Sequence, residues 1–251
     1  MTQIIIMALM IVPFLASQDM TSLTISAGIS ADFFVTNSKG QKTGKDPRPG
    51  GGRFKQIKGA GYGMENLDID GDAAFALNKF HVDAIVPPED FNCTITILGA
   101  KLDTVNLCVD IVHQGSAKTV SYESERFVDT NSVFSYRLTY FYVDSTRSYV
   151  ATFVPEYHNN TVWTDVKCAV RLGLLKDRKT AELMLERSAE LKEDLDAGAE
   201  TRAVGLARSM VAKIKEMKQA TSSGRSIADF AYKVIESDLQ YIIHSGGTTN
   251  E

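Results

Sequence analysis

The chain has 251 residues, a formal net charge of −4 and an ordinary composition, with 44% hydrophobic and 23% charged residues. This composition excludes a fully disordered chain and a collagen. Three cysteines are too few for a disulfide framework, so apolar burial has to supply the core.

Residues 1–17 form an apolar N-terminal segment. The run from Ile4 to Ala16 is too short to cross a bilayer, which takes about 20 residues. Its length and the small residues Ala16 and Ser17 fit a signal peptide, but no Lys or Arg precedes it. The alternative is a buried strand or short helix. A strand or a strand pair is predicted in the next region, 18–36.

Residues 37–66 are predicted to form a basic arm rich in Gly and Pro. Seven basic residues and one Asp between Lys39 and Lys58 give that stretch a net charge of +6, so the rest of the chain carries −10. Its glycines and prolines oppose helix and regular strand, which predicts a mobile loop. The arm either contacts phosphate, on single-stranded nucleic acid or an anionic membrane surface, or is a solvated linker. The candidate phosphate-binding residues are Lys42, Lys45, Arg48, Arg53, Lys55 and Lys58.

An acidic turn follows the arm. Asn66, Asp68, Asp70 and Asp72 have the spacing that opens a calcium loop, with Gly71 at the sixth position. The twelfth position, which needs a bidentate Glu, is Leu77. An acidic surface turn therefore remains the alternative, and the sequence predicts no resident metal or cofactor.

Residues 67–172 are predicted to form a β body. Period-two alternation predicts strands at Phe91–Leu98, Val105–Ile111, Ser132–Val143 and Arg147–Val154, with Thr161–Cys168 as the last strand. Short strands without intervening helices favour an antiparallel sandwich or a jelly-roll-like fold. The aromatic face of the third strand is either a core face, which we favour, or a nucleic-acid stacking platform. That face carries Phe134, Tyr136, Leu138, Tyr140 and Tyr142.

Residues 173–251 are predicted to be helical, which makes the whole chain an α+β protein. A stripe of mostly apolar side chains repeats about every 3.67 residues from Met184 to Met217, and Gly198 and Gly205 are possible breaks. This stripe either packs within the chain or forms a homo-oligomer. A capping box at Ser226–Asp229 is expected to open the last helix.

No catalytic motif is present. The sequence has no nucleophile elbow, no zinc-protease motif and no Cys pair with metal-ligand spacing, which favours a protein that is not an enzyme. Cys93 and Cys108 either pair across neighbouring strands in a secreted protein or remain buried thiols.

One stretch resembles the thirty-kilodalton superfamily of plant-virus movement proteins. Phe127-Val128-Asp129 precedes an aromatic strand, then Phe153-Val154-Pro155-Glu156-Tyr157, then Val162-Trp163, an order similar to that family's. The resemblance covers about residues 92–168. It implies a jelly-roll-like domain that binds nucleic acid without sequence specificity at cell junctions. Asp129 would take the signature position, for which Asp110 competes.

Three functions follow from these observations. The leading prediction is a non-enzymatic binding or assembly protein, such as a viral movement-type protein that contacts nucleic acid through the basic arm. The second is a secreted or envelope-associated binding or matrix-like protein whose first seventeen residues are removed. The third is a hydrolase that uses the carboxylates between Asp68 and Asp72.

Overall fold

The computed structural model describes residues 21–67, 75–85, 91–113, 118–143, 148–219 and 227–245. The apolar segment 1–17 and the calcium candidates Asp68, Asp70 and Asp72 lie outside these residues. Asn66 lies at the end of a strand, but its side chain is also outside the described part. The signal-peptide, calcium and hydrolase hypotheses therefore remain predictions.

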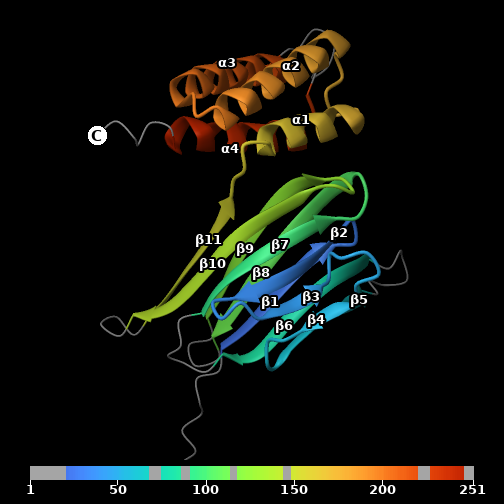
Figure 1. Cartoon of the computed structure of the whole chain (residues 1–251), viewed down its shortest axis with the longest axis vertical. Coiled ribbons are helices and arrows are strands. Elements are labelled where there is room, and N and C mark those ends of the chain that lie inside the picture. The colour runs from blue at the N-terminus through green and yellow to red at the C-terminus, as the bar shows by residue number, and fades with distance from the viewer. Residues whose placement is uncertain are drawn as a thin grey trace, which may run out of the picture.

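Eleven described strands form two antiparallel sheets, followed by four helices, which confirms the α+β prediction (Figure 1). The five-stranded sheet has the order β5 (Ala60–Leu67), β6 (Phe75–Ile85), β1 (Thr21–Gly28), β8 (Asp103–His113) and β9 (Lys118–Val128). The six-stranded sheet has the order β11 (Ser148–Glu156), β10 (Val133–Val143), β7 (Phe91–Gly99), β2 (Ala31–Asn37), β3 (Lys42–Lys45) and β4 (Arg53–Lys55).

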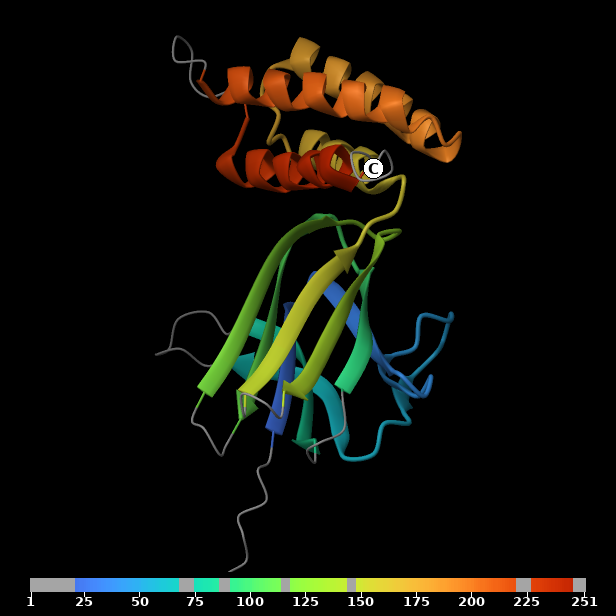
Figure 2. The same ribbon diagram turned by 90° about the vertical axis from the view of Figure 1, so that its left-hand side faces the viewer.

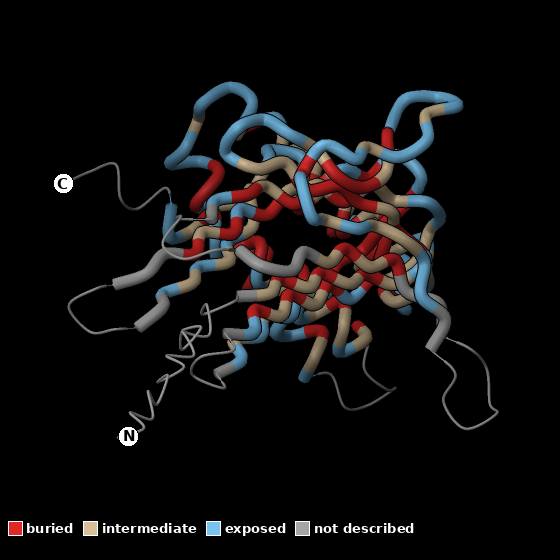
Figure 3. The backbone as a smooth tube through the Cα atoms, turned by 90° about the horizontal axis from the view of Figure 1, so that it is seen from below, coloured by how far each residue is buried: buried red, intermediate tan, exposed pale blue. Residues whose placement is uncertain are grey.

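Alternating residues of both sheets build one shared core. Leu23 and Ile25 of β1 and Phe33 and Val35 of β2 are at most 1% exposed, because successive side chains of a strand point to opposite faces. Figure 3 shows the buried segments gathered in the interior of the β body. The aromatic face of β10 belongs to this core, as predicted, through Phe134, Tyr136, Leu138 and Tyr140.

The basic arm is not the mobile loop that its Gly and Pro content predicted. Residues 42–45 and 53–55 form β3 and β4, which extend the six-stranded sheet beyond β2. A hydrogen bond outside the ladder also holds the chain that follows β4. The Ile57 N–H donates it to the Thr43 hydroxyl at 3.1 Å. The prediction failed because the ladder to β2 is a long-range interaction that local composition does not reveal.

Residues 161–168 are helical, which corrects the predicted last strand. Helix α1 (Thr161–Arg171) buries Val162, Val166 and Ala169, whose spacing of four and three places them on one helical face. The β body therefore ends at Glu156, and the helical region begins at Thr161 rather than at residue 173.

The predicted stripe is divided between two helices, α2 (Arg178–Asp196) and α3 (Glu200–Gln219), and the break occurs at Gly198, whose φ is +69°. Met184, Leu191, Met210 and Ile214 are all buried in a core formed by the four helices. The last helix, α4 (Asp229–Ser245), begins three residues after Ser226, which lies outside the described part. Oligomerisation through the tail remains a prediction.

The helices lie over one end of the β body, with α1 and α4 nearest to it (Figure 2). The contact is made through β9, whose Phe127 is fully buried in the helical core and packs edge-to-face against Phe230 of α4 at 4.9 Å. None of the described helices is long and apolar enough to cross a membrane.

The three cysteines are free thiols, so the disulfide alternative is wrong. Cys93 on β7 is buried in the core. Cys108 belongs to the other sheet, where its neighbours Leu107 and Val109 face the core and Cys108 faces outward.

Candidate functional site

The candidate site is the outer margin of the six-stranded sheet, which we call the basic edge and define as residues 42–58. The register pairs Lys45 with Arg53 and Thr43 with Lys55. Because side chains opposite each other share a face, Lys45, Arg53 and Lys55 lie on one face of the edge, and Lys42 and Phe54 lie on the other.

Two aromatic rings and a lysine meet on the Lys42 face. The rings of Phe34 and Phe54 lie edge-to-face with centroids 5.8 Å apart. The ammonium of Lys42 lies 5.1 Å from the Phe34 ring and 5.5 Å from the Phe54 ring. Phe34 is buried, whereas Phe54 is half-buried. The arrangement therefore places a cation beside an accessible ring.

Gly44 makes this contact possible. It lies between Phe34 and Phe54 in the ladder, so a side chain there would separate the two rings. A Cβ atom at Gly44 would lie 2.4 Å from the Phe33 carbonyl oxygen, and the residue has a φ of +130°. Only glycine fits this position without strain.

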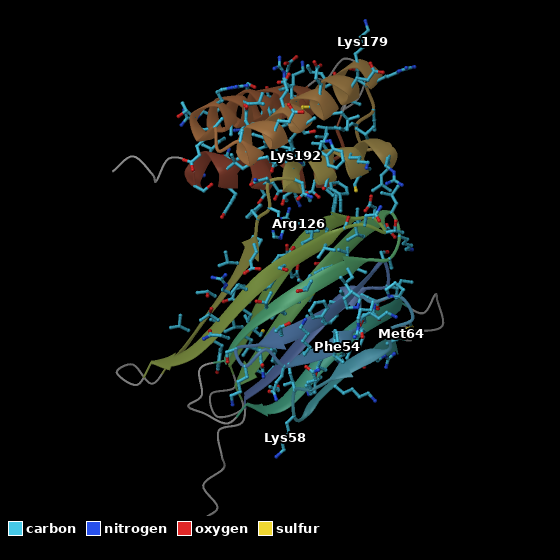
Figure 4. All side chains as sticks on the ribbon, in the orientation of Figure 1. Phe54, Lys58, Met64, Arg126, Lys179 and Lys192 are labelled. Atoms are coloured by element: carbon cyan, nitrogen blue, oxygen red, sulfur yellow. The ribbon has the colours of Figure 1, made fainter. Side chains whose placement is uncertain are left out.

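The opposite face joins the two sheets. The Arg53 guanidinium lies 5.6 Å from the ring of Tyr62 on β5 and donates a hydrogen bond to the Tyr62 carbonyl oxygen at 3.2 Å. Lys55 and Lys58 are exposed, and Figure 4 shows Lys58 projecting away from the body. Cations from the edge therefore lie on both faces, next to rings from β2, β4 and β5.

The turn between β3 and β4 contains an internal ion pair. Arg48 donates side-chain hydrogen bonds to both carboxylate oxygens of Asp46, and its backbone N–H donates to Oδ1. The side-chain and backbone hydrogen bonds from Arg48 lower the pKa of Asp46 to about 2. The charge of Arg48 is thus largely neutralised locally.

The other five predicted cations have no acidic partner within ion-pair distance in the described part of the chain. A cleft of about 510 Å³ lies beside the turn, between Lys45 and Arg48 on one side and Thr130 and Asn131 on the other. The structure therefore brings Lys42, Lys45, Arg48 and Arg53 to the edge and its cleft, while Lys55 and Lys58 extend the same margin.

A second cluster of charges is buried where the helices meet the β body. We call Arg126 of β9, Asp165 of α1 and Asp238 of α4 the ionic junction. Nη1 of Arg126 donates to Asp165 Oδ2 at 3.1 Å and to Asp238 Oδ1 at 2.5 Å, and Nε donates to the Tyr136 hydroxyl at 3.3 Å. Figure 4 places Arg126 just beneath the helices.

One cation faces two carboxyl groups in this junction. Burial raises the pKa of Asp165 well above its ordinary value, and the hydrogen bond and charge of Asp238 act in the same direction. Burial alone would lower the pKa of Arg126, but the charges of Asp238 and Asp165 raise it. The neutral arrangement is therefore one arginine, one carboxylate and one protonated carboxyl group.

Asp129, the residue at the resemblance's signature position, lies in the turn after β9. Its Oδ1 accepts from the Asn131 N–H and the Ser132 hydroxyl, and its Oδ2 accepts from Arg171 of α1 at 3.0 Å. Burial opposes its charge, yet these hydrogen bonds and Arg171 hold its pKa below the ordinary value. Asp129 thus has a structural contact with the helices, and its family role remains a prediction.

Sequence reasoning missed the ionic junction and the rings of the basic edge. Asp165 and Asp238 are acidic residues on otherwise apolar helical faces, beside Val166 and Leu239, and that mismatch was a usable signal. The described residues contain no group of three or more His, Cys, Asp or Glu side chains placed to hold a metal ion.

No family model, curated protein or solved structure matches this chain.

Proposed function

We propose that this protein binds single-stranded nucleic acid through the basic edge, without acting as an enzyme on it. The observation that carries the proposal is that aromatic rings lie at the same sheet margin as five cations without an acidic partner among the described residues. Lys42 lies beside both Phe34 and Phe54. Cations attract the phosphate backbone, and rings stack on unpaired bases.

A single strand fits this margin better than a duplex does. The half-buried Phe54 offers a ring face to a base only if that base is unstacked from its neighbours. The cleft beside the β3–β4 turn, of about 510 Å³, offers further space lined by Lys45 and by the exposed side chains of Thr130 and Asn131. Two carboxylates also line it, Asp46, which is paired with Arg48, and Asp32, which accepts a hydrogen bond from Tyr62. Phosphates would follow Lys42, Lys55 and Lys58 along the edge.

We also propose the finer form of this function, a movement-type protein whose two sheets make a jelly-roll-like sandwich. Its support is that β9 ends at Val128, directly before Asp129, which is the order that the resemblance implies. Val162 and Trp163, where the resemblance implies a further strand, lie instead on helix α1. In that case the protein acts at cell junctions, where membrane and nucleic acid meet.

The direct test is the affinity of the purified protein for a fluorescent single-stranded oligonucleotide, measured by anisotropy at several salt concentrations. The variant Lys42→Ala/Lys55→Ala/Lys58→Ala should bind more weakly and reduce the slope of log K against log salt by about 2, since three phosphate contacts are lost. The control Lys176→Ala/Lys179→Ala/Lys215→Ala removes the same charge from exposed positions of the helical region, one of them in the α1–α2 connection, and should keep the original slope.

A second variant tests the stacking part. Phe54→Leu keeps an apolar side chain at the edge but removes the ring, and should cost about 1–3 kcal/mol of binding free energy for single strands. Equal affinity of the two triple-lysine variants would reject the basic edge as the binding site. Base stacking would be rejected if the protein bound single strands and duplex with equal affinity and if Phe54→Leu left both affinities unchanged.

A further inference from the structure

The ionic junction connects three elements that are far apart in the sequence. Arg126 is 39 residues from Asp165 and 112 residues from Asp238, and all three side chains are buried. Among the described residues, these are the ion pairs in which both partners are buried, and both join β9 to a helix. The junction is therefore part of the interface between the β body and the helices.

Each of the two carboxyl groups has one buried oxygen atom that needs a hydrogen-bond donor. Oδ1 of Asp165 and Oδ2 of Asp238 are the buried side-chain oxygen atoms without a hydrogen-bond partner in the described part of the chain. The two carboxyl groups are themselves within hydrogen-bonding reach of each other. One proton between them satisfies both oxygens and cancels the excess negative charge beside Arg126.

The groups that surround the pair come from every element packed against it. Tyr136 of β10 contacts Arg126, and Tyr157, which follows β11, contacts Arg126 and lies near Asp238. Cys168 lies on α1 near Asp165. Glu123, Glu125, Lys233 and Ser237 line the adjoining cavity of about 320 Å³. Burial raises the pKa of Tyr157 to about 12 and that of Cys168 to about 11, so both are neutral in the range below pH 8.

We propose that the ionic junction is a proton-dependent latch, which holds the helical region against β9 with one proton shared by Asp165 and Asp238 and releases it as the pH rises. This inference concerns a different part of the molecule from the basic edge and does not depend on nucleic-acid binding.

The direction of the pH effect follows from which form of the protein, docked or open, binds the proton more tightly. When the helices are docked, Asp165 holds its proton, whereas a carboxyl exposed to water loses it near pH 4. The contribution of this proton to docking is therefore largest below about pH 4. Above that, the contribution falls and shifts the equilibrium toward the open form by about tenfold per pH unit for one proton, until the pH reaches the raised pKa of Asp165.

Hydrogen exchange of the α1 and α4 amides, corrected for the intrinsic pH dependence of exchange, measures this opening. In the wild-type protein the opening equilibrium should rise by about tenfold per pH unit within the window above. Asp165→Asn mimics the protonated carboxyl and should make the opening independent of pH. The control Asp196→Asn changes an exposed carboxylate of α2 and should keep the wild-type slope.

Asp238→Asn provides a second route, because it leaves Asp165 as the one carboxylate facing Arg126 and should also abolish the slope. Infrared spectroscopy of the wild-type protein, at a pH within the window where the opening rises, should detect a protonated carboxyl that is missing in either variant. A pH-independent wild type would overturn the latch. The latch would also be overturned if Asp165→Asn or Asp238→Asn kept the wild-type slope, or if the wild-type spectrum showed no protonated carboxyl. The junction would then be a purely structural ion pair.

Discussion

Arg48 and Arg126 both pair with aspartate, but they do so in opposite surroundings. Arg48 is 76% exposed in the β3–β4 turn and binds a neighbour two residues away. Arg126 is 8% exposed and binds Asp165 and Asp238, which are 1% and 0% exposed and come from distant helices. The same chemical pair is a local surface contact in one region and part of a tertiary interface in the other.

This difference determines what each region can contribute. An exposed cation exchanges water for a ligand at small cost, so the basic edge suits reversible binding of phosphate. A buried cation has lost its water and cannot lose its partners without leaving an uncompensated charge. The junction therefore suits the coupling of two parts of the fold, and the variants below separate the two roles.

The largest effect is expected for Arg126→Met. This change leaves two buried carboxyl groups without a cation, which should lower the free energy of unfolding by about 3–5 kcal/mol, measured by urea denaturation at pH 7. Arg48→Met is the matched control and should leave the urea midpoint nearly unchanged. The comparison between the two regions fails if both variants lose the same stability.

A second variant sharpens that result. Replacing the whole junction by Arg126→Met/Asp165→Leu/Asp238→Leu should recover most of the stability lost in Arg126→Met, because apolar side chains need no partner. It should also remove the pH dependence of docking.

A smaller effect is expected for Gly44→Ala in the basic edge. The added Cβ would lie 2.4 Å from the Phe33 carbonyl oxygen at a φ of +130°. Backbone strain and overpacking together should cost about 2–4 kcal/mol in urea denaturation. Gly40→Ala is the control, because Gly40 has a φ of +75° with open space around it, and should cost about 1 kcal/mol.

Gly44→Ala should also weaken oligonucleotide binding, since the Phe34–Phe54 contact depends on the missing side chain. If Gly44→Ala and Gly40→Ala destabilise equally and bind equally, the edge is held together in some other way, and the two regions differ less than proposed.

The sequence predicted the elements whose pattern is local. Alternation along Phe134, Tyr136 and Leu138 depends on neighbouring residues, and so does the helix break at Gly198, so both were confirmed. The strands β3 and β4 were missed because their pairing to β2 outweighs the Gly and Pro content. The helix α1 was missed, although Val162, Val166 and Ala169 have a helical spacing, because residues 161–168 follow directly on a series of predicted strands.

The candidate sites show the same contrast between features that depend on neighbouring residues and features that depend on the fold. The cations of the basic edge were visible as a local charge excess, from Lys42 to Lys58. The rings that accompany them come from β2, β4 and β5, and only the fold brings them together. The acidic residues on apolar helical faces could mark Asp165 and Asp238 as unusual, but no local pattern links Arg126 to Asp238, 112 residues away.

The smallest effect concerns the pH dependence of the Arg48–Asp46 pair. Because hydrogen bonds from Arg48 lower the pKa of Asp46 to about 2, its stabilising contribution is present above the unfolded pKa of about 3.8 and disappears as the pH falls through about 2. A carbon-detected NMR titration of the Asp46 carboxyl should give this low pKa in the wild type and a higher pKa in Arg48→Gln, still below 3.8 because the backbone N–H of residue 48 remains a donor. The junction has the opposite sign, since the raised pKa of Asp165 makes docking weaker as the pH rises. Acid should therefore loosen the β3–β4 turn and tighten the junction in the same molecule. An Asp46 pKa that does not move in Arg48→Gln would show that the pairing is not what stabilises the turn, and would remove one side of this contrast.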